Sequence, residues 1–180
     1  MFESIIFAGF GGQGIQSMSK ILAKAAMDEG LEVTWMPAYG GAMRGGTSNV
    51  TVMISDKLIG SPLANSGDMT VAVVMNNPSM AKFEPYVKPG GLLLVNSSLI
   101  DVPATRDDIT YVYVPVNDIA QELGNDKVGN MIMLGCLLEQ KKIVPVESLV
   151  QYVESVFASK PQVVDVNKLA IARGVEYAKR

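Results

Sequence analysis

Short apolar runs alternate with helical apolar patterns along the first part of the chain. The run at Ser4–Ala8 predicts a buried strand, and apolar residues at helical spacing from Ile15 to Ala26 predict the helix that follows it. Leu31–Met36 predicts a second strand, which ends at Pro37 because proline has no N–H group to donate to a sheet. The order of strand, helix and strand is typical of an α/β fold.

The next part of the chain predicts two more strands of different kinds. Val50, Val52 and Ile54 alternate with less buried positions, which is the period of a half-buried strand. We expect Asp56-Lys57 to form a hairpin turn into a short strand at 58–59, so that part of the sheet is antiparallel. The apolar, β-branched run Met69–Met75 predicts a central strand that is covered on both faces.

The remaining pattern favours helices. We predict a helix from Asn77 through Phe83, a turn at Lys88–Gly91, strands at 92–96 and 110–114, and then helices at 117–123, 127–140, 146–158 and 166–179. No repeat divides the sequence and no long linker interrupts it, so residues 1–180 are expected to form one domain. Together these elements predict a three-layer α/β/α sandwich around a mixed, mainly parallel sheet.

Composition excludes several classes of function. The net charge is -3 and no basic run is present, which argues against nucleic-acid binding. Histidine is absent and Cys136 is the single cysteine, so the chain cannot supply a zinc site or an iron–sulfur cluster by itself. Cys136 lies in an apolar stretch and is expected to be a core residue. The first residues lack the pattern of a signal peptide or membrane span, and we expect a cytoplasmic protein.

The balance of apolar and charged residues points to a partner. Hydrophobic residues make up 48% of the chain, 11 of them methionines, and charged residues only 18%. A domain of this size needs much polar surface, so we expect another chain to cover part of it, and a homodimer when partners are missing. A well-packed apolar domain without a partner is the alternative interpretation.

A glycine-rich loop follows the first predicted strand. The segment Gly9-Phe10-Gly11-Gly12-Gln13-Gly14 has the spacing G-x-G-x-x-G between a strand and a helix, where backbone N–H groups and the helix dipole favour an anion. The candidate cofactor-binding residues of this loop are Gly9, Gly11, Gly12, Gln13 and Gly14. The alternative is that the glycines only permit a tight turn and close packing of the helix on the sheet.

Two nucleotide-binding classes lack their usual companion residues. An NAD site needs an acidic residue near the end of the second strand, and Trp35–Tyr39 contains none. A phosphate-binding P-loop needs lysine and then serine or threonine, but Ile15 and Gln16 follow the last glycine. NAD binding and ATP hydrolysis are therefore not favoured.

A second glycine-rich loop contains one cation. Arg44 is the only charged residue between Glu32 and Asp56, and Gly45 and Gly46 follow it. An arginine with this much room can receive a phosphate, a carboxylate or a neighbouring subunit through two parallel hydrogen bonds. Arg44, Gly45 and Gly46 are therefore further candidate binding residues, and a solvated loop arginine is the alternative.

Taken in order, these motifs resemble the gamma subunit, or gamma domain, of 2-oxoacid:ferredoxin oxidoreductases. The matching segments span nearly the whole chain: 9–14, Tyr39-Gly40, Arg44–Thr47, Asn49-Val50, Asn125–Met131, Leu134-Gly135, Asn167, Ala170 and Gly174. One departure is Gly41-Ala42, where the family commonly has Pro-Glu, so a charge pairing through that glutamate is not expected here.

The resemblance implies a role inside a larger enzyme. Such complexes decarboxylate a 2-oxoacid oxidatively to an acyl-CoA and reduce ferredoxin, using thiamine diphosphate and iron–sulfur clusters. This chain would bind none of these cofactors alone and would have no activity when isolated. Alpha and beta subunits would be its partners, with a ferredoxin-like delta subunit as a further candidate. 2-Oxoglutarate is the substrate we favour, with 2-oxoisovalerate, pyruvate and indolepyruvate as alternatives.

Two other functions stay open at this point. The first is an independent nucleotide- or CoA-binding module that uses the Gly9–Gly14 loop without partners. The second is a stand-alone oxidoreductase with a bound flavin.

Overall fold

The computed structural model describes residues 1–39, 47–62 and 65–179. Within these ranges the chain forms six strands: β1 (Phe2–Phe10), β2 (Glu32–Tyr39), β3 (Thr47–Ser55), β4 (Met69–Val74), β5 (Val87–Asn96) and β6 (Thr110–Val114). The helices are α1 (Ile15–Asp28), α2 (Asn77–Phe83), α3 (Val116–Glu122), α4 (Gly129–Lys141), α5 (Val146–Val156) and α6 (Pro161–Ala178). Two short 3₁₀ helices, η1 (Glu84–Tyr86) and η2 (Asp126–Val128), precede β5 and α4.

All six strands belong to one mixed sheet. Their order is β2-β3-β1-β4-β5-β6, and the pairs β1–β4, β4–β5 and β5–β6 are parallel. The antiparallel part consists of β3, which pairs with β1 on one side and β2 on the other. The prediction of a mixed, mainly parallel sheet is confirmed.

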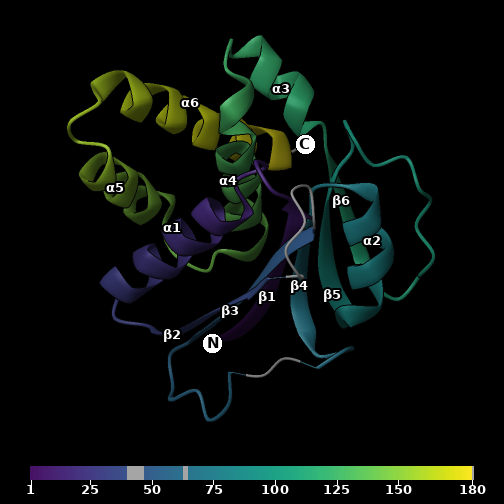
Figure 1. The fold of residues 1–180 in the computed structure, drawn as a ribbon. Coiled ribbons are helices and arrows are strands. Elements are labelled where there is room, and N and C mark those ends of the chain that lie inside the picture. Colours follow the sequence, from purple (N-terminus) through teal and green to yellow (C-terminus); the bar gives the residue numbers. More distant parts are fainter. Residues whose placement is uncertain (40–46, 63–64, 180) are drawn as a thin grey trace.

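The helices cover the two faces of the sheet unequally (Figure 1). Five of them, α1 and α3–α6, pack on the face from which Ile5 and Phe7 project, and they form the larger core. On the opposite face α2 places Met80 and Phe83 against Ile6, and the loop before β6 completes this smaller core. The three-layer α/β/α architecture is confirmed, with one thick and one thin helical layer.

Two glycines let α4 and α6 cross with their backbones in contact. A Cβ atom at Gly135 would lie 2.1 Å from the carbonyl oxygen of Ile171, and one at Gly174 would lie 1.9 Å from that of Ile132. These distances are far below van der Waals contact, so only glycine fits at either position. Both residues belong to the motifs that carry the family resemblance, and the structure gives them a packing role.

Three expectations about local structure were wrong. No strand forms at 58–59: β3 ends at Ser55, and Asp56 after it forms an ion pair with the N-terminal amine of Met1 at 2.6 Å. The turn predicted at Lys88–Gly91 lies inside β5, where Gly90 takes a φ of 74° and the register with β4 shifts. Helix α6 begins at Pro161, before the expected Val166, because proline is well suited to the first turn of a helix.

Cys136 is a core residue, as predicted. Its side chain is fully buried in α4, and this burial, together with the negative charge of Glu139, raises the pKa of the thiol to about 12. Within the described ranges, no helix combines the length and the apolar character that crossing a membrane requires.

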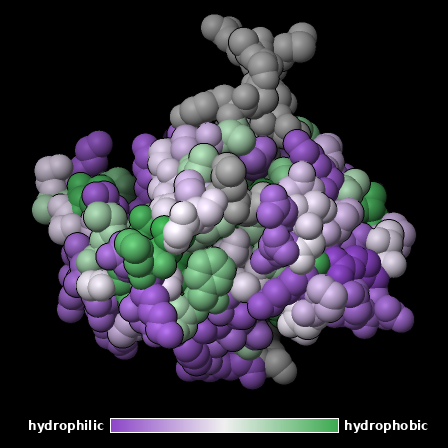
Figure 2. Space-filling view, turned by 90° about the horizontal axis from the view of Figure 1, so that it is seen from below, coloured by the Kyte–Doolittle hydropathy of each residue, from purple (hydrophilic) through white to green (hydrophobic). Residues whose placement is uncertain are grey.

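Some apolar side chains remain uncovered on the thin side of the molecule. Phe2 and Phe10 project from β1, and Met36 from β2, on the face that carries Ile6, and they are between 38% and 50% exposed. Figure 2, a view of one end of the molecule, shows separate apolar patches on a largely hydrophilic surface.

Candidate binding site at the carboxyl edge of the sheet

The chain leaves the sheet in opposite directions after two neighbouring parallel strands. β1 continues into α1 on the thick side, whereas β4 continues into α2 on the thin side. In open α/β sheets, ligands bind in the crevice at such a switch point, beyond the carboxyl ends of the strands. The Gly9–Gly14 loop therefore lies where the topology favours a binding site.

The glycine loop forms a tight turn that leads directly into α1. The N–H group of Gln13 donates to the carbonyl oxygen of Phe10 at 3.2 Å, and Gly12 has a φ of 95°, which strongly favours glycine. Gly14, with a φ of 74°, precedes α1, and no side chain caps that helix and no acidic residue occupies its first turn. The positive end of the α1 dipole is thus left for an external anion.

Gly11 and Gly12 face open space. A Cβ atom built on either residue would meet no atom within 4 Å, and both residues are exposed. Their N–H groups donate no hydrogen bond to any residue that the structure describes. These two positions have the free donors and the clearance that a close anion would need.

Gly9 and Gly14 serve packing instead. A Cβ atom at Gly9 would lie 2.6 Å from Oε1 of Gln13, and one at Gly14 would lie 2.5 Å from Nδ2 of Asn130. The four glycines therefore differ: Gly9 and Gly14 allow close approach within the protein, whereas Gly11 and Gly12 leave an open surface.

The side chain of Gln13 points into the protein. Its Oε1 accepts from the N–H group of Phe10 at 2.6 Å and from Nδ2 of Asn76 at 3.2 Å, and its Nε2 donates to the carbonyl oxygen of Met75 at 3.0 Å. The sequence made Gln13 a candidate ligand contact, but its amide is already used within the chain.

A cavity of about 230 Å³ opens beside the glycine loop, between β4 and the helices α3 and α4. Its lining includes Gly12 and Gln13 from the loop, Asn117 from α3, Lys127 from η2 and Asn130 from α4. Lys127 forms no ion pair with another residue of the described ranges, although Asp126 precedes it. Asp126 also lines the cavity, so its charged lining is one lysine and one carboxylate, beside side-chain amides and the glycine backbone. Lys127, the amides and the backbone N–H groups are the donors that an anionic ligand would use.

Our sequence analysis missed Lys127 and Asn130 as site residues. Both lie in the 125–131 segment, which we had used only as part of the family resemblance. The family motif at 125–131 was visible in the sequence, but no local pattern connects this segment to a loop more than a hundred residues earlier.

The second candidate loop cannot be placed in the same way. Arg44, Gly45 and Gly46 lie outside the described residues. β3 begins at Thr47, whose backbone pairs with Phe10 at the end of β1, so the described chain resumes beside the glycine loop.

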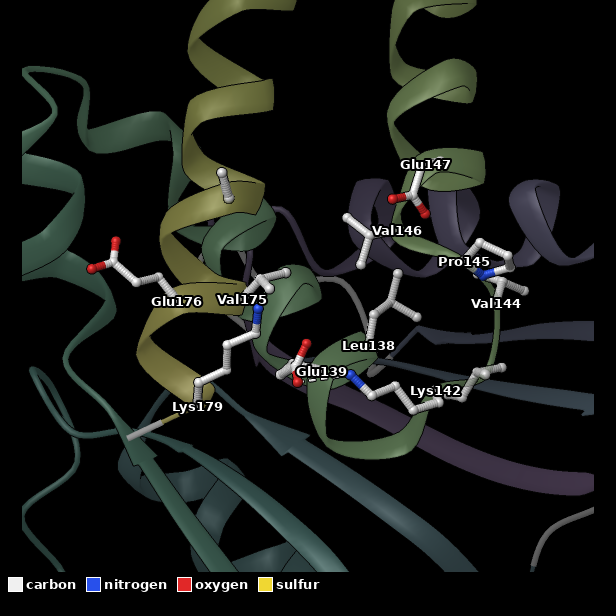
Figure 3. Close-up of a pocket in the computed structure, with 12 residues that line it drawn as sticks. Leu138, Glu139, Lys142, Val144, Pro145, Val146, Glu147, Val175, Glu176 and Lys179 are labelled. Carbon is white, nitrogen blue, oxygen red and sulfur yellow. Dashed lines mark ion pairs between the residues drawn. The ribbon is translucent and has the colours of Figure 1, made fainter.

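A larger cavity lies elsewhere, and none of the predicted site residues lines it. It measures about 710 Å³ and lies between the end of α4, the start of α5 and the end of α6 (Figure 3). Apolar side chains such as Leu138 and Val146 form its walls, and Lys142 at its rim is paired with Glu139 at 2.7 Å. No residue of the Gly9–Gly14 loop lines this cavity.

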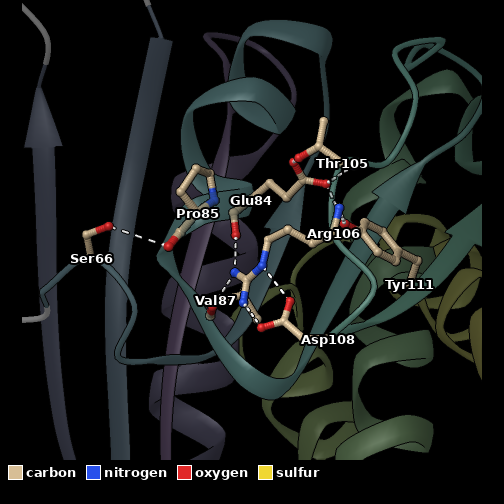
Figure 4. Close-up of polar contacts among 8 residues, drawn as sticks. All are labelled: Ser66, Glu84, Pro85, Val87, Thr105, Arg106, Asp108 and Tyr111. Carbon is tan, nitrogen blue, oxygen red and sulfur yellow. Dashed lines mark hydrogen bonds and ion pairs between the residues drawn. The ribbon is translucent and has the colours of Figure 1, made fainter.

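A network of charged residues occupies the opposite, amino edge of the sheet (Figure 4). The buried carboxylate of Glu84 accepts hydrogen bonds from the backbone and hydroxyl of Thr105 and from the hydroxyl of Tyr111. Arg106 donates to the carbonyl oxygens of Glu84 and Val87 and pairs with Asp108 at 2.6 Å. This network fastens the loop before β6 to η1.

These contacts change the pKa values of two groups. Burial of Glu84 favours the protonated form, but the hydrogen bonds from Thr105 and Tyr111 and the nearby charge of Arg106 outweigh it, so the pKa of Glu84 is lowered. Burial and the hydrogen bond to Glu84 raise the pKa of Tyr111 to about 12. At neutral pH, Glu84 is therefore a carboxylate and Tyr111 is a neutral phenol.

The fold and the site define a class: an α/β sandwich with a glycine loop and an anion-compatible cavity at its switch point. Residues 4–177 match the family model described as pyruvate ferredoxin/flavodoxin oxidoreductase. The chain belongs to this family, as the resemblance of its motifs predicted.

Relatives of two lengths match the chain. The ketoisovalerate oxidoreductase subunit VorA of Methanothermobacter marburgensis is 35% identical over 96% of this chain, but the match covers only 36% of VorA. The chain therefore spans about a third of the length of that relative. The 2-oxoglutarate synthase subunit KorC of the same organism is 32% identical, and the match covers 98% of this chain and 96% of KorC.

A solved structure agrees with the full-length match. The gamma subunit of a keto/oxoacid ferredoxin oxidoreductase from Geobacter sulfurreducens superposes with a TM-score of 0.84 at 27% identity, over 98% of each chain. The matches with KorC and with this gamma subunit thus extend along nearly the whole of both chains.

Proposed function

We propose that this chain serves as the gamma subunit of a 2-oxoacid:ferredoxin oxidoreductase complex and that its glycine loop and adjacent cavity hold the phosphate groups of coenzyme A. The complex would convert a 2-oxoacid and CoA to an acyl-CoA with reduction of ferredoxin. The observation that carries the proposal is that Gly12, with an open backbone donor, lines one cavity at the switch point together with Lys127, which has no ion pair among the described residues. Gly11, the neighbour of Gly12, also faces open space.

The chemistry of CoA matches this arrangement. Its phosphate groups are anions that accept hydrogen bonds from backbone N–H groups and from lysine. The uncapped start of α1 adds a favourable dipole on the same side of the sheet. Arg44, Gly45 and Gly46 remain proposed contributors, with Arg44 meeting either CoA or an acidic group of a partner subunit.

The redox cofactors do not fit this chain. Iron–sulfur clusters need several thiolates, whereas Cys136 is the single cysteine, and burial keeps it protonated. We therefore assign thiamine diphosphate and the clusters to alpha and beta subunits and to a ferredoxin-like delta subunit where one is present. The isolated gamma chain is expected to reduce neither ferredoxin nor a viologen dye.

An uncovered part of the sheet supports assembly. Phe2, Phe10 and Met36 project from one face of β1 and β2 beside α2, and Phe10 also belongs to the glycine loop. Contact with a partner there would bury apolar surface next to the proposed CoA site. A homodimer of the isolated chain through the same surface follows from the same chemistry.

We propose 2-oxoglutarate as the oxoacid. The relatives named above act on ketoisovalerate in one case and 2-oxoglutarate in the other. Purification of the complex from its host, identification of the co-purifying chains and comparison of kcat/KM for 2-oxoglutarate, 2-oxoisovalerate, pyruvate and indolepyruvate will decide between them.

The substitution Gly11→Ala tests the CoA site directly. The new methyl group meets nothing within 4 Å in the free chain, so folding should be unaffected, but it would occupy space that a bound phosphate needs. We expect the KM for CoA in the reconstituted complex to rise roughly tenfold or more, since a charge-assisted contact is worth about 1.5–3 kcal/mol. The KM for the oxoacid should not change.

Gly60→Ala provides the matched control. Gly60 is also exposed, has no positive φ and leaves open space around its missing side chain, but it lies outside the site. If Gly11→Ala binds CoA as well as Gly60→Ala does, the proposed CoA site is wrong.

The glycine loop is held by contacts of this chain alone, which favours one alternative function. An independent CoA- or nucleotide-binding module would be a monodisperse monomer with micromolar affinity in the absence of any partner. Calorimetric titration of the isolated chain with CoA and with ATP, together with light scattering, separates the two functions.

A further inference from the structure

The amide of Gln13 joins the two chain segments that diverge at the switch point. A glutamine amide offers two donor and two acceptor positions, and three of these four are used here. One acceptor position receives the N–H group of Phe10 at the end of β1, and the other receives the side chain of Asn76 after β4. The donor reaches the carbonyl oxygen of Met75.

The partner of Gln13 is itself part of the framework. Asn76 is 4% exposed, and its Oδ1 caps α2 by accepting from the N–H group of Ser79 at 2.9 Å. The N–H group of Met75 donates to the carbonyl oxygen of Ala8, which extends the pairing of β1 with β4. Gln13 therefore anchors the glycine loop to the end of β1 and to the backbone between β4 and α2.

The absence of a side chain at Gly9 makes this position of Gln13 feasible. A Cβ atom at Gly9 would lie 2.6 Å from Oε1 of Gln13 and 3.0 Å from Cβ of Met75. The amide thus occupies the space that a side chain at position 9 would need. Gly11 and Gly12 face open space, where a ligand can approach their N–H groups.

We propose that Gln13 is a positioning residue: its amide, bonded to Phe10, Met75 and Asn76, holds the N–H groups of Gly11 and Gly12 in the orientation that receives the CoA phosphate. This inference rests on the proposed function of the site. Fixing donors before binding removes part of the entropy cost of ordering the loop, so its effect belongs to affinity and not to the chemical step.

No other side chain of similar size supplies the same contacts. Methionine has a similar length but leaves the Phe10 N–H group and the Met75 carbonyl without partners. Asparagine retains the amide but is one methylene too short to reach both. We therefore expect Gln13→Met and Gln13→Asn to loosen the loop, and the use of two variants protects the test against a misfolded one.

The experiment uses the reconstituted complex and the isolated chain. In the complex, each Gln13 variant should raise the KM for CoA by about tenfold, while kcat and the KM for the oxoacid stay within about twofold. In the isolated chain, amide hydrogen exchange of residues 10–14 should become faster, while exchange in the rest of β1 and in β4 stays the same. A purely structural role would alter exchange throughout the core.

Gln140→Met is the matched control. The side chain of Gln140 also donates one hydrogen bond to a backbone carbonyl, that of Ala178 at 2.9 Å, but it joins α4 to α6 away from the site. This variant should change neither the KM for CoA nor the exchange of residues 10–14.

Lys127→Ala separates failure of this inference from failure of the proposed function. If Lys127→Ala weakens CoA binding and the Gln13 variants do not, the CoA site stands and the positioning role is wrong. Unchanged exchange of residues 10–14 in the Gln13 variants would also overturn that role. If none of the Lys127, Gly11 and Gln13 variants affects CoA, both proposals are wrong.

Discussion

The two edges of the sheet use polar groups in opposite ways. At the amino edge, Arg106 pairs with Asp108 and donates to the backbone carbonyl of Glu84. The carboxylate of Glu84 accepts hydrogen bonds from neighbours in the same chain. At the carboxyl edge, Gly11 and Gly12 expose backbone donors, and Lys127 has no ion pair among the described residues. The charged groups of the amino edge are paired within the chain, whereas the carboxyl edge has hydrogen-bond donors without acceptors among the described residues.

The difference separates residues that stabilise the fold from residues available for binding. A buried charge with several partners indicates an architectural role, since its removal leaves those partners unsatisfied. An exposed donor without a partner contributes little to folding and can be used for a ligand.

The substitution Glu84→Ala should have the largest effect on stability. It leaves the backbone and hydroxyl of Thr105 and the hydroxyl of Tyr111 without their acceptor, and we expect the free energy of unfolding to fall by about 3 kcal/mol. Urea denaturation measures the loss. Asp107→Ala, in the same loop but exposed, is the control and should change stability by less than about 0.5 kcal/mol. Comparable losses in both variants would contradict the architectural role.

Gly14→Ala should have an intermediate effect, because Gly14 is a packing residue within the carboxyl edge. The methyl group would lie 2.5 Å from Asn130, and a φ of 74° is unfavourable for alanine, so we expect a loss of about 2 kcal/mol. Asn130→Ala in the same chain should recover the steric part but not the backbone part. A double-mutant cycle by denaturation measures the coupling, and additive losses would show that the two residues do not press on each other.

Acid should weaken the Glu84 network at the amino edge, and this effect should be the smallest. The pKa of Glu84 is lower in the folded chain than its ordinary value of 4.5, so its stabilisation is complete above that pH and is lost as the pH falls through the folded pKa. Glu84→Gln, which cannot titrate, should lose less stability than the native chain below pH 4.5. Denaturation curves at pH 3 and pH 6 test this, and parallel losses in both proteins would assign the acid sensitivity to other carboxylates.

Much of the fold could be predicted because it depends on local patterns. The apolar run at Met69–Val74 and the strand at Thr110–Val114 were recognised from their composition, and Asn77-Pro78 marked the start of α2. The failures have local causes too. Asp56 was predicted to begin a hairpin turn, but it pairs with the N-terminal amine of Met1. The glycines at 90 and 91 were predicted to form a turn, but they lie within β5.

The glycine loop shows where local pattern stops being informative. Its spacing indicated an anion site or a packing turn with equal force, because glycine serves both purposes. The structure distinguishes them through neighbours that are distant in sequence: Asn130 lies against Gly14, and Met75 and Asn76 receive Gln13. The same folding brings Lys127 into the cavity beside Gly12.

By itself, the sequence determined the class of fold, the core role of Cys136 and the family, because each depends on residue identity and order along the chain. Only the tertiary structure decided which glycines are open and which are packed, where the amide of Gln13 points and which edge of the sheet has unsatisfied donors. Those properties depend on distances between β1, β4 and α4, and such distances are fixed by packing across the whole sheet and by no local segment of the chain.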